Sequence, residues 1–361
     1  MRFLNGGFGA LLQDLHGADA SHLRRPEVGE ALRHAWLQAR LLVIRGLDLS
    51  PDDFAAISRH FGPLGPVPAG RDHAKLGPGG CILRIGNIRD HTGNLISQPS
   101  STKEDVLAQD GSCQYRPAER LPVWHTDGTF KEKPDAGTAL YCHRAPPEGG
   151  ATCFADAASA WDGLPFSQQE RLLKLECLCS LTHHDAKIKK RNPDYPMLTE
   201  EERKRNPPRR VPLALKHPET GRHAIYGINS STCCVLEHDQ EVDHERLENL
   251  ELNGEEDDSV SILQDLLVHA TAPTYTVPLL QFRFSPRLLE NHSLRKVQTS
   301  PFPSRSKISF PIDMCTFNCE VCWQWQPGDL AICDTRSTMH CATSYNQQKY
   351  TREMWRTTIQ A

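Results

Sequence analysis

The sequence predicts an α+β fold with a mostly antiparallel β-core and flanking helices. Helix and strand patterns alternate over the first sixty residues, whereas much of the rest consists of short apolar segments separated by Gly, Pro and Asp. Short strands with turn signals between them are typical of sandwiches and barrels. The chain has 361 residues, of which 38% are apolar and 24% charged. That length permits one large domain or two ordinary ones, with the composition of a soluble globular protein.

The N-terminal part predicts helix, strand and helix in that order. Residues 22–40 carry apolar side chains at helical spacing, and LLVIRG at 41–46 is a short apolar strand that ends in glycine. In the next segment, 50–62, Ser50 is a suitable N-cap, proline takes the first helical position, and Gly62 ends the helix.

The central part predicts a series of β-strands with two added helices. The helices are expected at DAASAWDGLP (156–165) and SQQERLLKLECL (167–178). Six segments have β-type composition and turn residues at their ends: 81–88, 123–130, 138–145, 151–156, 211–217 and 223–228.

Charge and composition exclude several functional classes. The net charge of −4 gives no basic field for nucleic acid, and the basic run 187–210 also holds acids and prolines, so we interpret it as a solvated loop. No apolar stretch has the length of a membrane span, and the N-terminal residues lack the long apolar core of a secretory signal, which predicts a cytoplasmic protein without a membrane partner. The 13 scattered cysteines predict reduced thiols. The sequence leaves open whether the protein forms a homo-oligomer.

The stretch VWHTDGTF, residues 123–130, carries the first candidate chemistry. If it is a strand, His125 and Asp127 point to the same side, because side chains alternate along a strand. An imidazole and a carboxylate are two parts of the two-histidine, one-carboxylate triad of non-haem iron enzymes. Taken alone, the pair is better explained as a surface pair or a His–Asp hydrogen bond. The metal interpretation needs a distant second histidine and an anion anchor.

Candidates for both occur near the C-terminus. His340 follows a Pro-Gly-Asp turn and the apolar strand LAIC. In YTREMWRTTI, Arg352 and Arg356 are four residues apart on a strand-like stretch, so they are expected to face the same way. Arginine suits a dicarboxylate because its planar guanidinium binds a carboxylate through two hydrogen bonds. The alternative is that both arginines are solvated charges.

Several ordered segments together resemble the TauD/TfdA family of Fe(II)- and 2-oxoglutarate-dependent dioxygenases, over most of the chain. They are LLVIRGLDLSPDDFAAISRHFG, WHTDGTF, RAPPEGGATCFADAASAWDGLP, HPETGRHAIYGIN and WQPGDLAICDTRSTMH. The resemblance implies one domain over 1–361 with a double-stranded β-helix, or jelly-roll, core.

The same resemblance implies the site and the reaction. His125, Asp127 and His340 match the iron ligands, Thr152 and Arg352 match residues that bind 2-oxoglutarate, and Arg356 matches an arginine that meets the substrate anion in some members. The cofactors implied are Fe(II), 2-oxoglutarate as cosubstrate, and O2. The reaction implied is hydroxylation of a small organic anion, coupled to decarboxylation of 2-oxoglutarate to succinate and CO2.

Two departures from the family pattern qualify this interpretation. Residues 277–319 have no family counterpart and are expected to be an insertion, either a lineage-specific loop or translated non-coding sequence. The second is favoured because the flanking segments join naturally without them. Leu121 stands where taurine-cleaving members tend to have a polar residue, whereas CILRIGNIRDHTGNLI is closer to the TfdA-like branch. A non-catalytic metal- or ligand-binding relative and a zinc hydrolase remain alternatives.

Overall fold

The α+β class is confirmed by a computed structural model. It describes residues 8–12, 20–67, 74–89, 92–93, 95–97, 115–116, 121–122, 124–191, 197–241, 259–272, 275, 322–343 and 345–361. The predicted insertion at 277–319 therefore lies outside the described residues.

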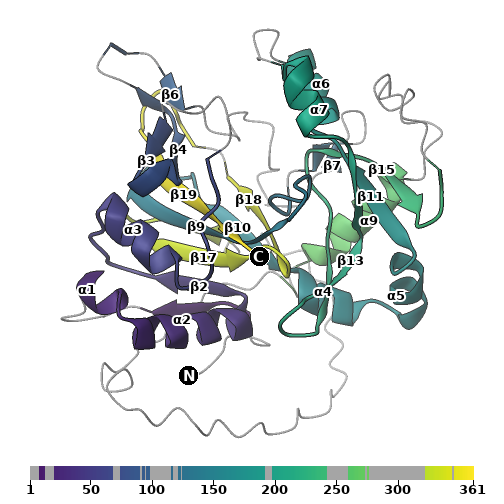
Figure 1. Ribbon diagram of the computed structural model, residues 1–361, viewed down its shortest axis with the longest axis horizontal. Coiled ribbons are helices and arrows are strands. Elements are labelled where there is room, and N and C mark those ends of the chain that lie inside the picture. Colours follow the sequence, from purple (N-terminus) through teal and green to yellow (C-terminus); the bar gives the residue numbers. More distant parts are fainter. Residues whose placement is uncertain are drawn as a thin grey trace, which may run out of the picture.

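A seven-stranded sheet forms the larger half of the structure (Figure 1). Its strand order is β1-β2-β17-β9-β19-β4-β3, and each neighbouring pair is antiparallel except β1 and β2. The bounds are β1 Ala10–Leu12, β2 Leu41–Ile44, β3 Lys75–Leu76, β4 Ile82–Gly86, β9 Asp135–Arg144, β17 Leu330–Asp334 and β19 Glu353–Gln360.

Two three-stranded sheets and three short hairpins complete the strands of the described residues. The first sheet contains β16 (Cys322–Trp323), β10 (Thr152–Asp156) and β18 (Thr338–Ala342), and the second contains β12 (Arg209–Pro212), β11 (Leu175–Cys179) and β15 (Thr232–Glu237). The hairpins are β13 (Ala214–Lys216) with β14 (His223–Ile225), β5 (Ile88–Arg89) with β6 (Leu95–Ser97), and β7 (Tyr115–Arg116) with β8 (Leu121–Pro122).

Helices pack against these sheets. The bounds are α1 Ala20–Leu23, α2 Pro26–Ala39, α3 Pro51–Ser58, α4 Ala157–Gly163, α5 Phe166–Leu172, α6 Leu181–Arg191, α7 Glu200–Arg205 and α9 Ser259–Ala270, with the 3-10 turn η2 at Pro78–Gly80. The predicted start of α3 is confirmed, because the Ser50 side chain accepts from the Asp53 backbone N–H and Asp53 caps Ser50 in return. None of the helices in the described part of the chain has the length and apolarity that a membrane crossing requires.

Three apolar layers separate the elements, and the alternation of side chains along the strands decides which layer each residue enters. The outer face of the seven-stranded sheet packs against α2 and α3 through Trp36, Phe54 and Trp355. The inner face packs against the β16-β10-β18 sheet through a second cluster that includes Phe154 and Met354. The far side of the β16-β10-β18 sheet then meets α4, α9, β11 and the β13–β14 hairpin.

The predicted helix at 167–178 is wrong in its second half. Helix α5 ends at Leu172, and residues from Leu175 onward form β11, which pairs with β12 and β15. Leu175, Cys177 and Cys179 are buried on alternate positions, so tertiary pairing overrides the local helical pattern. The prediction of reduced thiols needs one correction, because Cys153 is in a disulfide.

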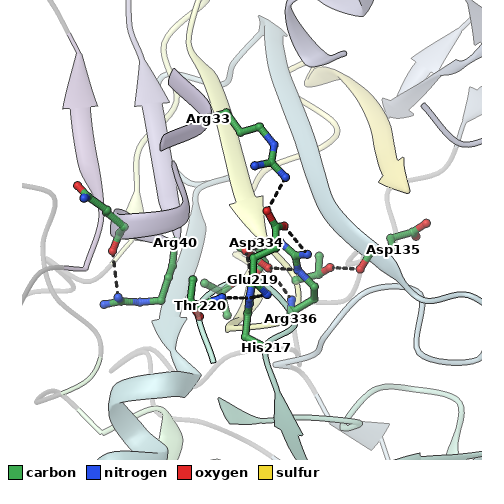
Figure 2. Close-up of polar contacts among 11 residues, drawn as sticks. Arg33, Arg40, Asp135, His217, Glu219, Thr220, Asp334 and Arg336 are labelled. Atoms are coloured by element: carbon green, nitrogen blue, oxygen red, sulfur yellow. Dashed lines mark hydrogen bonds and ion pairs between the residues drawn. The ribbon is translucent and has the colours of Figure 1, made fainter. Parts of the chain in front are cut away.

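A buried polar network fixes the turn between β17 and β18, the hairpin that carries His340 (Figure 2). Asp334 accepts hydrogen bonds from Nε2 of His217 at 2.9 Å and from two guanidinium nitrogens of Arg336 at 2.9 and 2.8 Å. Arg336 also pairs with Glu219 at 3.0 Å, and Glu219 pairs with Arg33 of α2 at 2.6 Å. The network therefore joins α2, the β13–β14 hairpin and the β17–β18 turn.

We expect Asp334→Asn to lower the free energy of unfolding at pH 7 by about 3 kcal/mol or more, because it leaves Arg336 and His217 incompletely paired in a buried site. Burial raises the pKa of the Asp334 carboxyl, but hydrogen bonds from His217 and Arg336 outweigh it and lower that pKa overall. A lowered folded-state pKa gives stability that is present above the unfolded pKa of about 3.9 and is lost as the pH falls through the folded value. The difference between wild type and variant should therefore narrow only below about pH 4.

Urea unfolding of the metal-free protein at pH 7, 5 and 3 measures both effects. Asp162→Asn is the matched control, since Asp162 forms an exposed ion pair with Arg222 and its loss should cost less than about 1 kcal/mol. Equal effects of the two substitutions at pH 7 would contradict the role given to Asp334.

Candidate metal centre

The motif around His125 is not the regular strand that the sequence predicts. His125 forms an isolated antiparallel bridge with His340, and residues 127–130 form a turn. Each of the two histidines donates its backbone N–H to the carbonyl of the other at 3.0 Å. Gly128 adopts φ +72°, a left-handed conformation that glycine accepts without strain. His125 and Asp127 therefore point to the same place because of this bridge and turn, and not because side chains alternate along a strand.

The structure brings His125, Asp127 and His340 together, as predicted. One ligand atom from each side chain lies within 4.8 Å of the others. Nε2 of His125 is 3.7 Å from Oδ1 of Asp127, and Nε2 of His340 is 3.7 Å from Oδ2. Neighbouring donors around an octahedral ion with bonds of about 2.1 Å are about 3 Å apart, so small movements would suffice for binding. Two nitrogens and one carboxylate fit a divalent transition metal.

The surroundings set the protonation states that metal binding needs. Burial alone would raise the pKa of the Asp127 carboxyl, but the charges of Arg356 and of the two histidines, with a hydrogen bond from Thr138, hold it well below its usual range. Burial lowers the pKa of the His340 imidazole to about 3. Near pH 7 the carboxylate is therefore ionised and His340 is neutral, which is the state in which each can bind a metal.

Access to these side chains is uneven. The His125 side chain is 34% exposed, whereas those of Asp127 and His340 are each 11% exposed. His340 faces Phe154 across the β10–β18 pair, with ring centroids 6.2 Å apart. A molecule that reaches the three ligand atoms therefore approaches on the side of His125.

Arg356 lies beside the cluster of His125, Asp127 and His340. Its guanidinium is 2.9 Å from Oδ2 of Asp127, and its side chain is 26% exposed. The solvated-charge alternative is therefore wrong for Arg356. In the structure Arg356 contacts Asp127, a predicted metal ligand. Contact of Arg356 with a substrate stays a prediction.

Arg352 is buried, 8% exposed, immediately before β19. Its Nε donates to the Gly150 carbonyl at 3.0 Å, and no carboxylate among the described residues pairs with it. Burial lowers the pKa of this guanidinium, although arginine keeps its charge at pH 7. A buried charge without a counter-ion is costly, so the position favours binding of an anion from outside the chain.

Thr152 lies two residues beyond the carbonyl that Arg352 contacts. Its hydroxyl oxygen accepts from Nε1 of Trp325 at 2.9 Å, which leaves the hydroxyl proton available to a further acceptor. Thr152 and the Gly150 carbonyl that Arg352 contacts are thus close in sequence, and a ligand shared by Arg352 and Thr152 stays a prediction.

Three further residues support the site and had no distinctive sequence signal. Thr138 of β9 donates from its hydroxyl to Oδ2 of Asp127 at 2.8 Å. Asn87 accepts from the Arg352 backbone N–H at 2.8 Å and from the Tyr345 hydroxyl at 2.9 Å, which fixes the approach to β19. Trp325 orients Thr152. Thr138 bonds a residue 11 positions away, and Asn87 and Trp325 bond residues more than 170 positions away, so local patterns could not reveal the contacts.

The model of the family described as "Taurine catabolism dioxygenase TauD, TfdA family" matches residues 3–279 and 312–358. The chain belongs to this family. The predicted resemblance is thereby confirmed. The match omits residues 280–311, which fall within the 277–319 segment, and the insertion itself stays a prediction.

Two of the curated relatives have names that specify their cosubstrate. The chain is 26% identical over 216 residues to the (S)-phenoxypropionate/alpha-ketoglutarate-dioxygenase of Delftia acidovorans, covering 56% of this chain and 65% of the relative. It is 28% identical over 200 residues to the alpha-ketoglutarate-dependent 2,4-dichlorophenoxyacetate dioxygenase of Cupriavidus pinatubonensis, covering 52% and 59%. The matched part thus spans about three fifths of these relatives' length. The pentalenolactone F synthase of Streptomyces avermitilis is 27% identical over 65% of this chain and 73% of its own.

Two solved structures have a fold similar to that of this chain. The crystal structure of AAD-2 in complex with Mn(II) and N-oxalylglycine has a TM-score of 0.61 at 19% identity, covering 100% of this chain and 97% of that chain. A putative alpha-ketoglutarate-dependent taurine dioxygenase from Burkholderia xenovorans has a TM-score of 0.60 at 19% identity, covering 99% and 88%. At this identity the likeness supports the fold alone.

Proposed function

We propose that the chain is an Fe(II)- and 2-oxoglutarate-dependent dioxygenase that hydroxylates a small organic anion. One observation carries the proposal: two imidazoles and a carboxylate converge within 4.8 Å, with Arg356 beside them. The same C-terminal segment also holds Arg352, which is buried and pairs with no carboxylate of the described residues. Names of curated TauD/TfdA relatives support the same cosubstrate.

His125, Asp127 and His340 would hold the iron, which supplies oxygen activation when it is bound. The chain's own part is to present one anionic and two neutral donors. Burial keeps His340 unprotonated, and Thr138 and Arg356 orient the Asp127 carboxylate. Phe154 and the two facing sheets limit the access of water to the His340 side of the site.

Arg352 and Thr152 would bind the distal carboxylate of 2-oxoglutarate. The guanidinium offers nitrogens beyond the Nε that contacts Gly150, and the Thr152 hydroxyl can donate its free proton to the same carboxylate. Binding of the dicarboxylate would supply the counter-ion that Arg352 lacks among the described residues.

The substrate class rests on Arg356 and on the relatives. The named relatives act on phenoxypropionate and 2,4-dichlorophenoxyacetate, which are carboxylates attached to an aromatic ring. We propose small organic anions of this kind as the first substrates to test. Arg356 remains partly exposed while it pairs with Asp127, so one guanidinium can contact both the ligand carboxylate and a substrate anion.

The assay is substrate-independent release of succinate from 2-oxoglutarate by the purified protein with Fe(II). We expect release above a metal-free control, and a further increase with an accepted substrate from a panel of aryloxyalkanoates, sulfonates and xanthine. The full chain and a variant without residues 277–319 are measured in parallel. A folded protein that binds neither Fe(II) nor 2-oxoglutarate would favour the non-catalytic alternative, and zinc-dependent hydrolysis would favour a hydrolase.

The finer architecture is part of the same proposal. We infer that the inner face of the seven-stranded sheet and the β16-β10-β18 sheet form the two walls of a double-stranded β-helix, since one apolar cluster lies between them. Cytoplasmic location, absence of nucleic-acid and membrane partners, and oligomeric state stay predictions.

A further inference from the structure

Asp127 has two carboxylate oxygens, and the structure treats them differently. Oδ2 accepts a hydrogen bond from the Thr138 hydroxyl at 2.8 Å and forms an ion pair with the Arg356 guanidinium, 2.9 Å away. No described residue donates a hydrogen bond to Oδ1, which faces Nε2 of His125 at 3.7 Å. Oδ2 is therefore held by one hydrogen bond and one ion pair, whereas Oδ1 accepts no hydrogen bond from a described residue.

We propose that Thr138 is a positioning residue that, together with Arg356, holds Oδ2 of Asp127 so that Oδ1 alone binds the metal. The inference rests on the proposed metal site and goes beyond it, because it assigns the orientation of the carboxylate to a hydroxyl on β9. Outer hydrogen bonds of this type orient metal ligands and typically change metal affinity 10–100-fold when removed.

The placement of Thr138 explains why it can do this and its strand neighbours cannot. On β9, Ala139 and Tyr141 belong to the cluster against α2 and α3, whereas Leu140 and Cys142 belong to the cluster between the sheets. Alternation therefore directs Thr138 to the same inner side. Thr138 is 1% exposed, so water cannot readily replace its hydroxyl as the donor.

The two partners of Oδ2 also differ in rigidity. Thr138 is β-branched and lies in the middle of a sheet, where it pairs with Cys333 on β17 and Thr358 on β19. Arg356 reaches Asp127 through a long side chain that is 26% exposed. Thr138 thus fixes the carboxylate even if Arg356 turns toward a substrate.

The test compares Thr138→Val, which removes the hydroxyl at nearly constant shape, with Thr138→Ser, which retains it. Co(II) serves as the probe because its visible absorption reports coordination without turnover. We expect Thr138→Val to weaken Co(II) binding about 10- to 100-fold and to alter the absorption spectrum. Thr138→Ser should stay within about threefold of wild type, as a difference of under about 0.7 kcal/mol.

Thr357→Val is the matched control, since the buried Thr357 hydroxyl on β19 donates to the Cys81 carbonyl at 2.9 Å. It should lower thermal stability without changing Co(II) affinity or spectrum. Wild-type affinity and spectrum in a folded Thr138→Val protein would overturn the inference, as would equal weakening by the Val and Ser substitutions. A folded wild-type protein that binds no Co(II) would instead overturn the proposed function itself, and the inference with it.

Discussion

His340→Ala abolishes the Fe(II)-dependent release of succinate and weakens metal binding by more than about 100-fold. The effect should exceed the 10–100-fold loss typical of outer hydrogen-bond partners, because the substitution removes a donor atom itself. It also leaves the remaining pair on a single loop, with only His125 and Asp127 to hold the ion. Succinate release and Co(II) titration measure the two effects.

His143→Ala is the control for this result. His143 lies on β9 of the seven-stranded sheet and stacks on Trp355 with ring centroids 5.0 Å apart, so its removal changes a histidine outside the three-residue cluster. It should retain metal binding and turnover. A folded His340→Ala protein with more than about a tenth of wild-type turnover would remove His340 from the predicted ligand set.

The second large effect concerns the cosubstrate. Arg352→Met should weaken 2-oxoglutarate binding at least about 30-fold, because removing one partner from a buried, hydrogen-bonded charge pair costs about 2–5 kcal/mol. Isothermal titration with 2-oxoglutarate measures the loss. Metal affinity should be little changed, since Arg352 contacts Gly150 and none of the three predicted ligands.

A comparison ligand separates anion recognition from general damage. 2-Oxopentanoate has the same chain length as 2-oxoglutarate but a methyl group in place of the distal carboxylate. Wild type should strongly prefer 2-oxoglutarate, and Arg352→Met should lose that preference. Arg33→Met, a change on α2 that breaks the ion pair between Arg33 and Glu219, should retain the preference for 2-oxoglutarate. If Arg352→Met discriminates between the two ligands as wild type does, Arg352 is not the anchor.

The fold and the site were predictable from the sequence to different degrees. Helices α2 and α3 follow from local signals, such as the Ser50 cap and the apolar spacing of 22–40. The predicted end of the helix at 167–178 was wrong, because β11 pairs with two other strands and this pairing decides the conformation from Leu175 onward. Local sequence patterns do not indicate which distant strands will pair.

The predicted site residues show the same division. The three predicted metal ligands do converge, but through the bridge between His125 and His340 and not through a regular strand. Arg356 was expected at a substrate anion, and its observed contact is with Asp127. Thr138 was not distinguishable from other threonines, since its significance depends on a carboxylate brought to it by the fold.

The central position of β19 has a consequence for how the chain is made. The seven-stranded sheet places β19 between β9 and β4, and β17 between β2 and β9, so strands from the last part of the sequence complete a layer begun by the first. During synthesis β2, β4 and β9 therefore each lack at least one neighbour in the sheet until β17 and β19 have left the ribosome. Such long-range pairing makes folding slow and exposes intermediates to aggregation. Chaperone supply should therefore govern the yield of active protein more strongly than it would for a chain folded from local contacts.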